Sequence, residues 1–184
     1  MLCNYQGVFR HLEFKERYRN MRAKQKGFSL IELLIVVAII LIIAAIAIPN
    51  LIRSKMAANE ASAVASVRTI NTAQVVYSTT YSIPSVFSVL LKDLGDTAGT
   101  CATVPPIATN ACLVDNVLAQ NGIPAGSGKS GYNFVYANPA PGTYTINANP
   151  VTANSSGVRG FFADQTLVIR VANPAPATNA SNPL

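Results

Sequence analysis

The sequence predicts an α+β protein in which one long N-terminal helix packs on an antiparallel sheet of about four strands. Three observations lead to this prediction. An uncharged apolar run covers residues 33–52, an alanine-rich stretch of helical periodicity continues to residue 81, and short alternating segments fill residues 132–172. One helix followed by a run of strands is the element order of an α+β fold, in which the sheet buries one face against the helix.

Composition and charge narrow the class of protein. Half of the 184 residues are apolar and only 12% are charged, whereas average soluble domains carry about 25% charged residues. The net charge of +6 lies almost wholly in residues 1–26, which hold seven basic and two acidic side chains. A nucleic-acid-binding face needs its lysines and arginines on the folded part of the chain. We therefore do not expect nucleic-acid binding.

Residues 33–52 are long enough to cross a membrane as a helix, because twenty residues at about 1.5 Å each match a hydrocarbon core of about 30 Å. The basic residues precede this run, so the positive-inside rule places residues 1–26 in the cytoplasm and the rest of the chain outside. Two alternatives are a plain signal anchor and a cleaved secretory signal, for which Ala45-Ile46-Ala47 offers a small-x-small pattern. The run exceeds the usual secretory core of ~7–15 residues, which disfavours the cleaved signal.

Glu32 stands one residue before the uncharged run. An acidic side chain costs about 2.5–3.5 kcal/mol at the centre of a membrane helix and less near its end, and such residues are usually functional. If the chain is cut after Gly27, the new α-amine of Phe28 has a reference pKa of about 7.7–8.0 and is mostly protonated at neutral pH. Glu32 could pair with this amine or with that of a neighbouring subunit. A pair between subunits would fix their register.

The stretch KGFSLIELLIVVAII at residues 26–40, followed by Pro49 and an amphipathic helix, resembles the leader and N-terminal helix of type IV pilins and the related pseudopilins. The resemblance implies that a prepilin peptidase cuts between Gly27 and Phe28 and methylates the Phe28 amine. It also implies that Glu32 neutralises the amine of an adjacent subunit and that the N-terminal helices hold a homopolymer together. The further partners implied are an assembly platform with its ATPase and an outer-membrane secretin.

Residues 1–27 are expected to form a basic leader that is absent from the mature protein. The residues from Met21 to Gly27 would make a complete leader by themselves. Residues 1–20 are then either the start of a long leader or the product of a misassigned start codon. Cys3 and His11, the only histidine, lie in this part of the chain.

The helix is expected to continue beyond the apolar run. Pro49 removes a backbone donor and clashes with the carbonyl of Ala45, which predicts a kink near the outer membrane boundary. Residues 53–81 contain no glycine or proline and are rich in alanine, a strong helix former. Side chains at three- and four-residue spacing form a stripe for the sheet to cover, and other positions are polar. The stripe is Val64, Val67, Ile70, Ala73 and Tyr77, and the polar positions are Arg53, Lys55, Glu60 and Arg68.

Residues 82–131 are dense in turn-forming residues and predict a loop-rich region with a short helix over 86–94. Cys101 and Cys112 lie in a segment expected outside the cytoplasm, where an even pair of cysteines predicts a disulfide. A metal site is the alternative, which the lack of a histidine or an acidic cluster nearby disfavours. The segment Gly126-Ser127-Gly128-Lys129-Ser130 lacks the full spacing of a phosphate-binding loop and is interpreted as a turn.

Two hairpins are expected in the last third of the chain. The first has its turn at residues 138–142, and the second turns through Asp164-Gln165. Residues 173–184 are polar and rich in proline, which predicts a flexible tail. The predicted strands are 132–136, 143–147, 158–163 and 166–171. The expected organisation is a leader at 1–27, a membrane-spanning half-helix at 28–52, an amphipathic half-helix at 53–81, a loop-rich region at 82–131, a β region at 132–172 and a tail at 173–184.

The mature chain offers few groups for catalysis. An enzyme needs a nucleophile with a base, a carboxylate pair or a metal cluster. Here the acids are scattered, and Asp93 and Asp96, the two that lie close together, are expected to terminate a helix. We therefore expect no enzymatic activity, no cofactor and no bound metal.

A structural subunit remains, namely a single-pass inner-membrane precursor that polymerises through its apolar half into an extracellular filament. The resemblance implies adhesion or motility as the role of such a filament. One alternative is a major pseudopilin of a type II secretion system, and alternatives from other classes are a membrane-anchored monomer and a DNA-uptake binding protein. If the resemblance is to the major pseudopilins, it implies acidic residues in the loop near the last strands that bind calcium. Asp164 stands alone there, which favours a pilin.

Overall fold

The computed structural model describes residues 27–81, 87–96, 99, 101–120 and 128–184. The expected leader apart from Gly27, the segment 82–86, and Gly126 and Ser127 of the expected turn lie outside the described residues. The chain divides into two compact units, one ending at Ala47 and the other beginning at Ile48. Helix α2 (Leu30–Thr80) runs through both units. The elements that follow are η1 (Leu91–Leu94), α3 (Asn116–Ala119), β1 (Tyr132–Ala137), β2 (Thr145–Pro150), β3 (Gly160–Asp164), β4 (Arg170–Ala172) and β5 (Asn182–Pro183).

Helix α2 begins at Leu30, and the preceding Gly27, Phe28 and Ser29 are not helical. The amide of Leu33 donates to the carbonyl of Ser29 at 3.2 Å, which is the first hydrogen bond of the helix. Leucine, alanine and other strong helix formers then follow without a glycine. Pro49 lies within α2, which continues on both sides of it. The kink expected at Pro49 stays a prediction.

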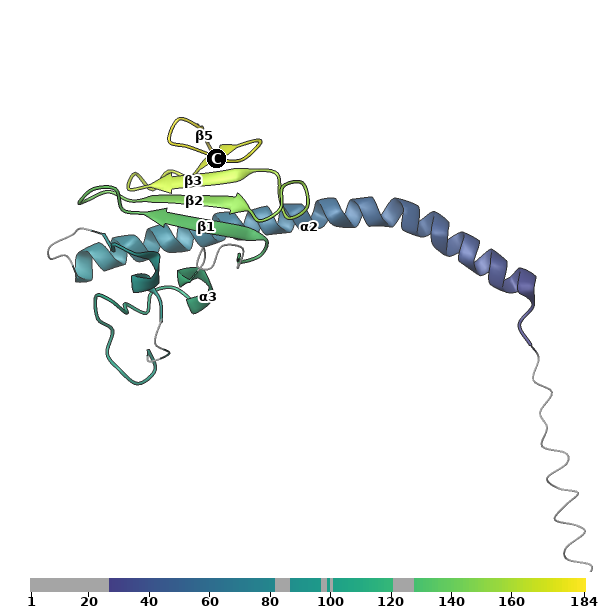
Figure 1. Cartoon of the computed structure of the whole chain (residues 1–184), viewed down its shortest axis with the longest axis horizontal. Helices are drawn as coiled ribbons and strands as arrows, with labels where there is room; N and C mark the ends of the chain where they lie inside the picture. The colour runs from purple at the N-terminus through teal and green to yellow at the C-terminus, as the bar shows by residue number, and fades with distance from the viewer. Residues whose placement is uncertain (1–26, 82–86, 97–98, 100, 121–127) are drawn as a thin grey trace, which may run out of the picture. The chain divides into compact units, whose positions relative to one another are not determined.

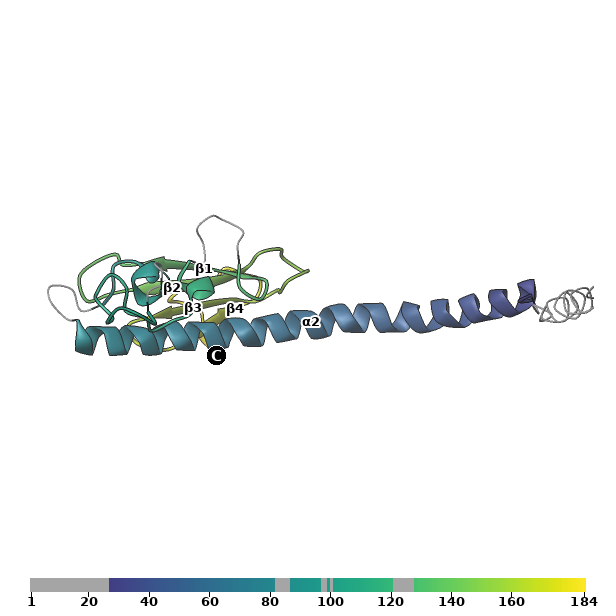
Figure 2. The same ribbon diagram turned by 90° about the horizontal axis from the view of Figure 1, so that it is seen from below.

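Five antiparallel strands form one sheet in the order β1-β2-β3-β4-β5. The strands are paired so that Phe134 of β1 lies opposite Ala148 of β2, which in turn lies opposite Phe161 of β3. Figures 1 and 2 show the sheet lying along one side of the head portion of α2. The predicted α+β fold is therefore confirmed.

The core of the second unit lies between α2 and the sheet. All five members of the predicted helical stripe are buried, with exposed fractions from 0% for Val67 and Ile70 to 9% for Val64. Alternate residues of β1, β2 and β3 face them, because successive side chains of a strand point to opposite faces. Each large apolar side chain buried in this way stabilises the fold by about 1.5–3 kcal/mol. The fully buried members from the sheet are Tyr132, Phe134, Ile146, Ala148, Phe161 and Ala163.

The prediction of a short helix at residues 86–94 is partly wrong. Among its described residues only η1 is helical, and it is a single 3₁₀ turn. The turn begins where Asp93 accepts a hydrogen bond from the Leu90 amide at 3.3 Å. Helix α3 was not predicted, because four residues are too few to show a helical period.

The first predicted hairpin is present, but its second strand, β2, begins two residues later than predicted and runs to Pro150. The second hairpin differs more, because β4 begins at Arg170 rather than at Thr166. The Asp164 carboxylate accepts hydrogen bonds from the amide and the hydroxyl of Thr166, and Leu167 adopts a positive φ of 65°. This local hydrogen bonding competes with the ladder and widens the loop.

The flexible tail predicted at residues 173–184 is not what the structure contains. Strand β5 pairs with β4 and brings the number of strands to five. Ala177 is only 2% exposed, the Ala175 amide donates to the Val158 carbonyl, and the Leu184 amide donates to the Ile169 carbonyl. The proline-rich composition suggested mobility, but backbone hydrogen bonds to the sheet hold this segment.

Candidate functional site: the processing junction, the apolar helix and the head

The expected cleavage site lies in an exposed, non-helical segment immediately before α2. Gly27 and Phe28 are both exposed, and Phe28 is 77% exposed. A Cβ added to Gly27 would meet no atom within 4 Å. The described residues therefore leave the peptide bond between Gly27 and Phe28 uncovered.

Glu32 lies in the first turn of α2. The positive end of the helix dipole favours an acidic side chain at this position. Its side chain is exposed and makes no hydrogen bond or ion pair with the described residues. The carboxylate is therefore available to a group outside the chain, as the sequence-based hypothesis requires.

The described residues leave the apolar start of α2 uncovered around its circumference. Between Phe28 and Ile52 the exposed fractions of the large apolar side chains run from 44% at Val37 to 83% at Leu30. The helix is long and apolar enough to cross a membrane, and none of its apolar stretch is buried among the described residues. Two environments suit such a surface, a lipid hydrocarbon core or other apolar helices.

Glu60 connects α2 to the segment that leads into β3. Its Oε1 accepts hydrogen bonds from the amides of Val158 at 3.0 Å and Arg159 at 3.1 Å, and its Oε2 accepts one from the Arg159 Nε at 2.7 Å. Burial acts to raise the pKa of Glu60, but these three hydrogen bonds outweigh it and hold the pKa below its ordinary value.

The same junction is closed by two further contacts. The Asn59 side chain donates to the carbonyl of Ser156 at 2.8 Å, and the Tyr132 hydroxyl donates to the carbonyl of Arg159 at 2.7 Å. The Tyr132 ring packs directly on Gly157, where an added Cβ would stand 2.1 Å from the hydroxyl oxygen. Gly157 is therefore needed for this close approach of strand, loop and helix.

The sequence-based interpretation treated Glu60 as one of the polar positions of the helix, whereas the residue is 8% exposed. The signal that could have identified it is spacing, since Glu60, Val64 and Val67 lie four and three positions apart on the buried stripe. Asn71 and Gln74 continue that spacing and are also buried.

Gln74 organises a second buried polar network. Its amide nitrogen donates to the hydroxyl oxygens of Ser88 at 2.7 Å and Tyr136 at 2.9 Å, and its amide oxygen accepts from the Ser88 amide at 3.0 Å. The Tyr136 hydroxyl in turn donates to the Ser88 carbonyl. Buried polar groups that are satisfied in this way specify one arrangement of the core.

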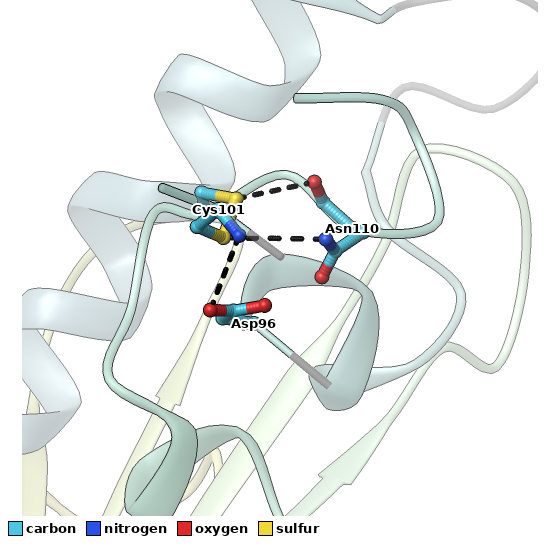
Figure 3. Close-up of a disulfide and its surroundings, with 4 residues drawn as sticks. Asp96, Cys101 and Asn110 are labelled. Carbon is cyan, nitrogen blue, oxygen red and sulfur yellow. Dashed lines mark hydrogen bonds between the residues drawn. A yellow bond between two sulfur atoms is a disulfide. The ribbon is translucent and has the colours of Figure 1, made fainter. Parts of the chain in front are cut away.

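Cys101 and Cys112 form the predicted disulfide, with their Cα atoms 5.9 Å apart. Figure 3 shows Asp96 and Asn110 beside it, and the Asp96 carboxylate accepts a hydrogen bond from the Cys101 amide at 3.3 Å. The closed loop is tied to η1, since the Ala111 amide donates to the Asp93 carbonyl at 2.8 Å.

The segment expected as a turn near Lys129 is a turn in its described part. The Lys129 and Tyr132 backbones exchange two hydrogen bonds, and Ser130 and Gly131 between them both have positive φ, as in a type I′ turn. Lys129 also pairs with Asp115. Across the described residues, no three histidine, cysteine, aspartate or glutamate side chains gather where they could hold a metal ion.

Comparisons with known proteins match only part of the chain. A family model described as the prokaryotic N-terminal methylation motif matches residues 22–48, which include Gly27 and Phe28 of the expected cleavage site and Glu32. The type IV major pilin protein PilA of Myxococcus xanthus (strain DK1622) is 45% identical over 58 residues. The resemblance to type IV pilins is confirmed.

The match to the Myxococcus pilin covers 32% of this chain and 26% of that protein, so the chain matches about a quarter of the length of its curated relative. No solved structure matches the chain. The family model covers the N-terminal motif and most of the apolar run. The α+β layout of the head comes from the structure.

Proposed function

We propose that the chain is the structural subunit of a type IV pilus, held in the inner membrane as a precursor and polymerised after processing into an extracellular filament. The observation that carries the proposal is the apolar helix that the described residues leave uncovered, most of which lies within the match to the methylation motif. Removing apolar surface from water is favourable by about 25 cal/mol per Å². Lipid covers this surface before assembly, and the helices of neighbouring copies cover it in the filament.

The orientation in the membrane follows from charge. The basic residues of 1–26 precede the apolar helix and remain in the cytoplasm under the positive-inside rule. The head then lies outside, where the Cys101–Cys112 disulfide is stable because that compartment is oxidising.

Processing starts at the junction between Gly27 and Phe28. A prepilin peptidase cuts this bond and methylates the new Phe28 amine. The open space around Gly27 and the exposure of Phe28 support access of an enzyme to this bond.

Glu32 sets the register of assembly by pairing with the Phe28 amine of a neighbouring copy. A carboxylate surrounded by apolar helices is costly unless it is paired, and the Glu32 carboxylate has no partner among the described residues of its own chain. The amine of an offset neighbour supplies the opposite charge.

The remaining partners follow from the pilin proposal. They are an assembly platform with its ATPase and an outer-membrane secretin, and the filament serves adhesion or motility. The relative is named a major pilin, which favours a pilin over a pseudopilin. The role is structural, so the head needs no catalytic groups.

Glu32→Ala tests the register. The variant is expected to insert and to be processed normally, yet to give at least tenfold fewer filaments in the fraction sheared from cells. Ser29→Ala is the matched control, because it also shortens an exposed side chain beside the first turn of α2 and changes neither the charge nor the apolar surface. Normal filament yield from Glu32→Ala would contradict the register role.

Gly27→Phe tests the cleavage site. A bulky side chain next to the scissile bond is expected to block cleavage, so that unprocessed precursor accumulates in the membrane fraction on immunoblots. Mature protein beginning at Phe28 in this variant would show that the peptidase does not depend on Gly27.

A further inference from the structure

Two cations stand where the apolar part of α2 ends on the head side. Arg53 and Lys55 are the first charged residues after the uncharged run of residues 33–52, and both side chains are exposed. The two ion pairs found within the described residues are Lys129–Asp115 and Arg159–Glu60, and neither includes these cations.

The acids of the same unit are engaged elsewhere. Glu60 is held by Arg159, and Asp115 by Lys129. Asp93 accepts from the Leu90 amide, Asp96 from the Cys101 amide, and Asp164 from Thr166. No ion pair joins Arg53 or Lys55 to an acid of the described chain, so both cations are free to meet an anionic group from outside it.

The position of the two cations along α2 matches a membrane surface. Ile52 ends a run about 30 Å long, and Arg53 and Lys55 follow within about 5 Å along the axis. The polar headgroup layer on each side of the hydrocarbon core is about 5–8 Å thick. Arg53 and Lys55 are two positions apart, which places their side chains about 200° apart around the helix axis. Headgroups on both sides of the helix are therefore within reach.

Arg53 and Lys55 lie on the non-cytoplasmic side of the proposed membrane helix, where the positive-inside rule disfavours basic residues. Before processing, the leader outweighs them with a net charge of +5 in residues 1–26. Cleavage after Gly27 removes that charge, and the mature helix then carries its side-chain cations only at the head end. An attraction at this end would hold the processed helix at a fixed depth.

We propose that Arg53 and Lys55 bind the phosphate groups of anionic phospholipids in the leaflet that faces the head, and so fix the depth of the processed subunit. The proposal rests on the proposed function, because it requires that α2 spans a bilayer. The Arg53 guanidinium can hold a phosphate through two parallel hydrogen bonds, whereas Lys55 acts as a point charge. The apolar stems of both side chains extend along the helix while their charged ends reach the phosphates.

Arg68 provides a matched control on the same helix. It is exposed and makes no ion pair with the described residues. It lies thirteen positions beyond Lys55, which is about 20 Å further from the membrane, so it should not reach the phosphates.

The test measures lipid selection by electron paramagnetic resonance of the full chain reconstituted in phosphatidylcholine vesicles. The probes are spin-labelled phosphatidylglycerol and spin-labelled phosphatidylcholine, and the readout is the relative association of the two with the protein. Each cation near an anionic surface contributes roughly a fivefold preference. Arg53→Gln with Lys55→Gln should therefore lower the preference for phosphatidylglycerol at least fivefold, whereas Arg68→Gln should leave it unchanged.

The leader cations contribute equally to all three proteins, so the comparison isolates the head end of the helix. The difference should shrink at about 1 M salt, where the Debye length is about 3 Å. An unchanged preference in the double variant, with the protein still inserted, would overturn the proposal and leave carboxylates of a neighbouring copy as the partner. Failure of the wild-type chain to insert, judged by protease protection, would instead contradict the proposed function together with this inference.

Discussion

Glu60 shows how a single side chain can join distant parts of the head. Its carboxylate receives three hydrogen bonds from residues 98 and 99 positions later in the chain. The pair is asymmetric, because the Glu60 side chain is 10% exposed and that of Arg159 is 45% exposed. The backbone amides of Val158 and Arg159 therefore depend on Glu60 more than the guanidinium does, since water can reach the guanidinium.

Glu60→Gln is expected to lower the free energy of unfolding by about 1–3 kcal/mol, because the amide keeps the size of the side chain but removes its charge and has one acceptor atom for the three donors that the two carboxylate oxygens serve. The measurement is urea unfolding of the full chain in detergent, followed by circular dichroism. Arg68→Gln, on the same helix and exposed, should change the free energy by less than about 0.5 kcal/mol. Equal values for the two variants would refute the role of Glu60.

The pH dependence has a defined sign. The folded-state pKa of Glu60 is lowered, so the stability that it contributes is full above its ordinary value of about 4.3 and is lost as the pH falls through the folded pKa. The difference between the wild type and Glu60→Gln should be largest near pH 7 and should shrink below about pH 4. A difference that stays constant down to pH 3 would contradict this explanation.

The N-terminal residues were easier to predict from the sequence than Glu60. Gly27, Phe28 and Glu32 lie within one short motif, so their roles could be expected without any tertiary information. The partners of Glu60 lie almost a hundred positions away, and local periodicity carries no information about such a pair. The buried position of Glu60 was still readable from its spacing to Val64 and Val67.

At the scale of elements, the disulfide stabilises the loop-rich region next to η1. It closes a loop over a sequence separation of 11, for which the chain-entropy model gives a contribution of about 3 kcal/mol. Replacing Cys101 and Cys112 together with serine should lower the free energy of unfolding by about that amount. Treating the wild type with a reductant should reproduce the loss, and a double variant as stable as the wild type would contradict the prediction.

Long elements, in which the hydrophobic pattern repeats several times, were predictable from the sequence. Elements of two to four residues were not. The stripe on α2 repeats over many turns, and all five of its predicted members are buried. Strand β4 was displaced because Asp164 bonds to Thr166 and Leu167 takes a positive φ. Strand β5 has two residues, and its pairing with β4 could not be read from a proline-rich segment.

At the scale of the whole molecule, the two units differ in what covers their apolar side chains. The unit beginning at Ile48 buries its own core between α2 and the sheet. The described part of the other unit is an apolar helix with nothing of the described chain over it. Folding alone therefore stabilises the head, whereas the N-terminal helix requires lipid or other copies of the chain.

Intact-mass measurement and N-terminal sequencing of the protein sheared from the cell surface test this account most directly. The account predicts filaments whose subunits begin at Phe28 and carry a methyl group on its amine. Protein that begins at Phe28 but stays in the membrane fraction would favour a pseudopilin. A soluble chain beginning at Ile48 would contradict the account, because the apolar helix would then have been removed as a secretory signal.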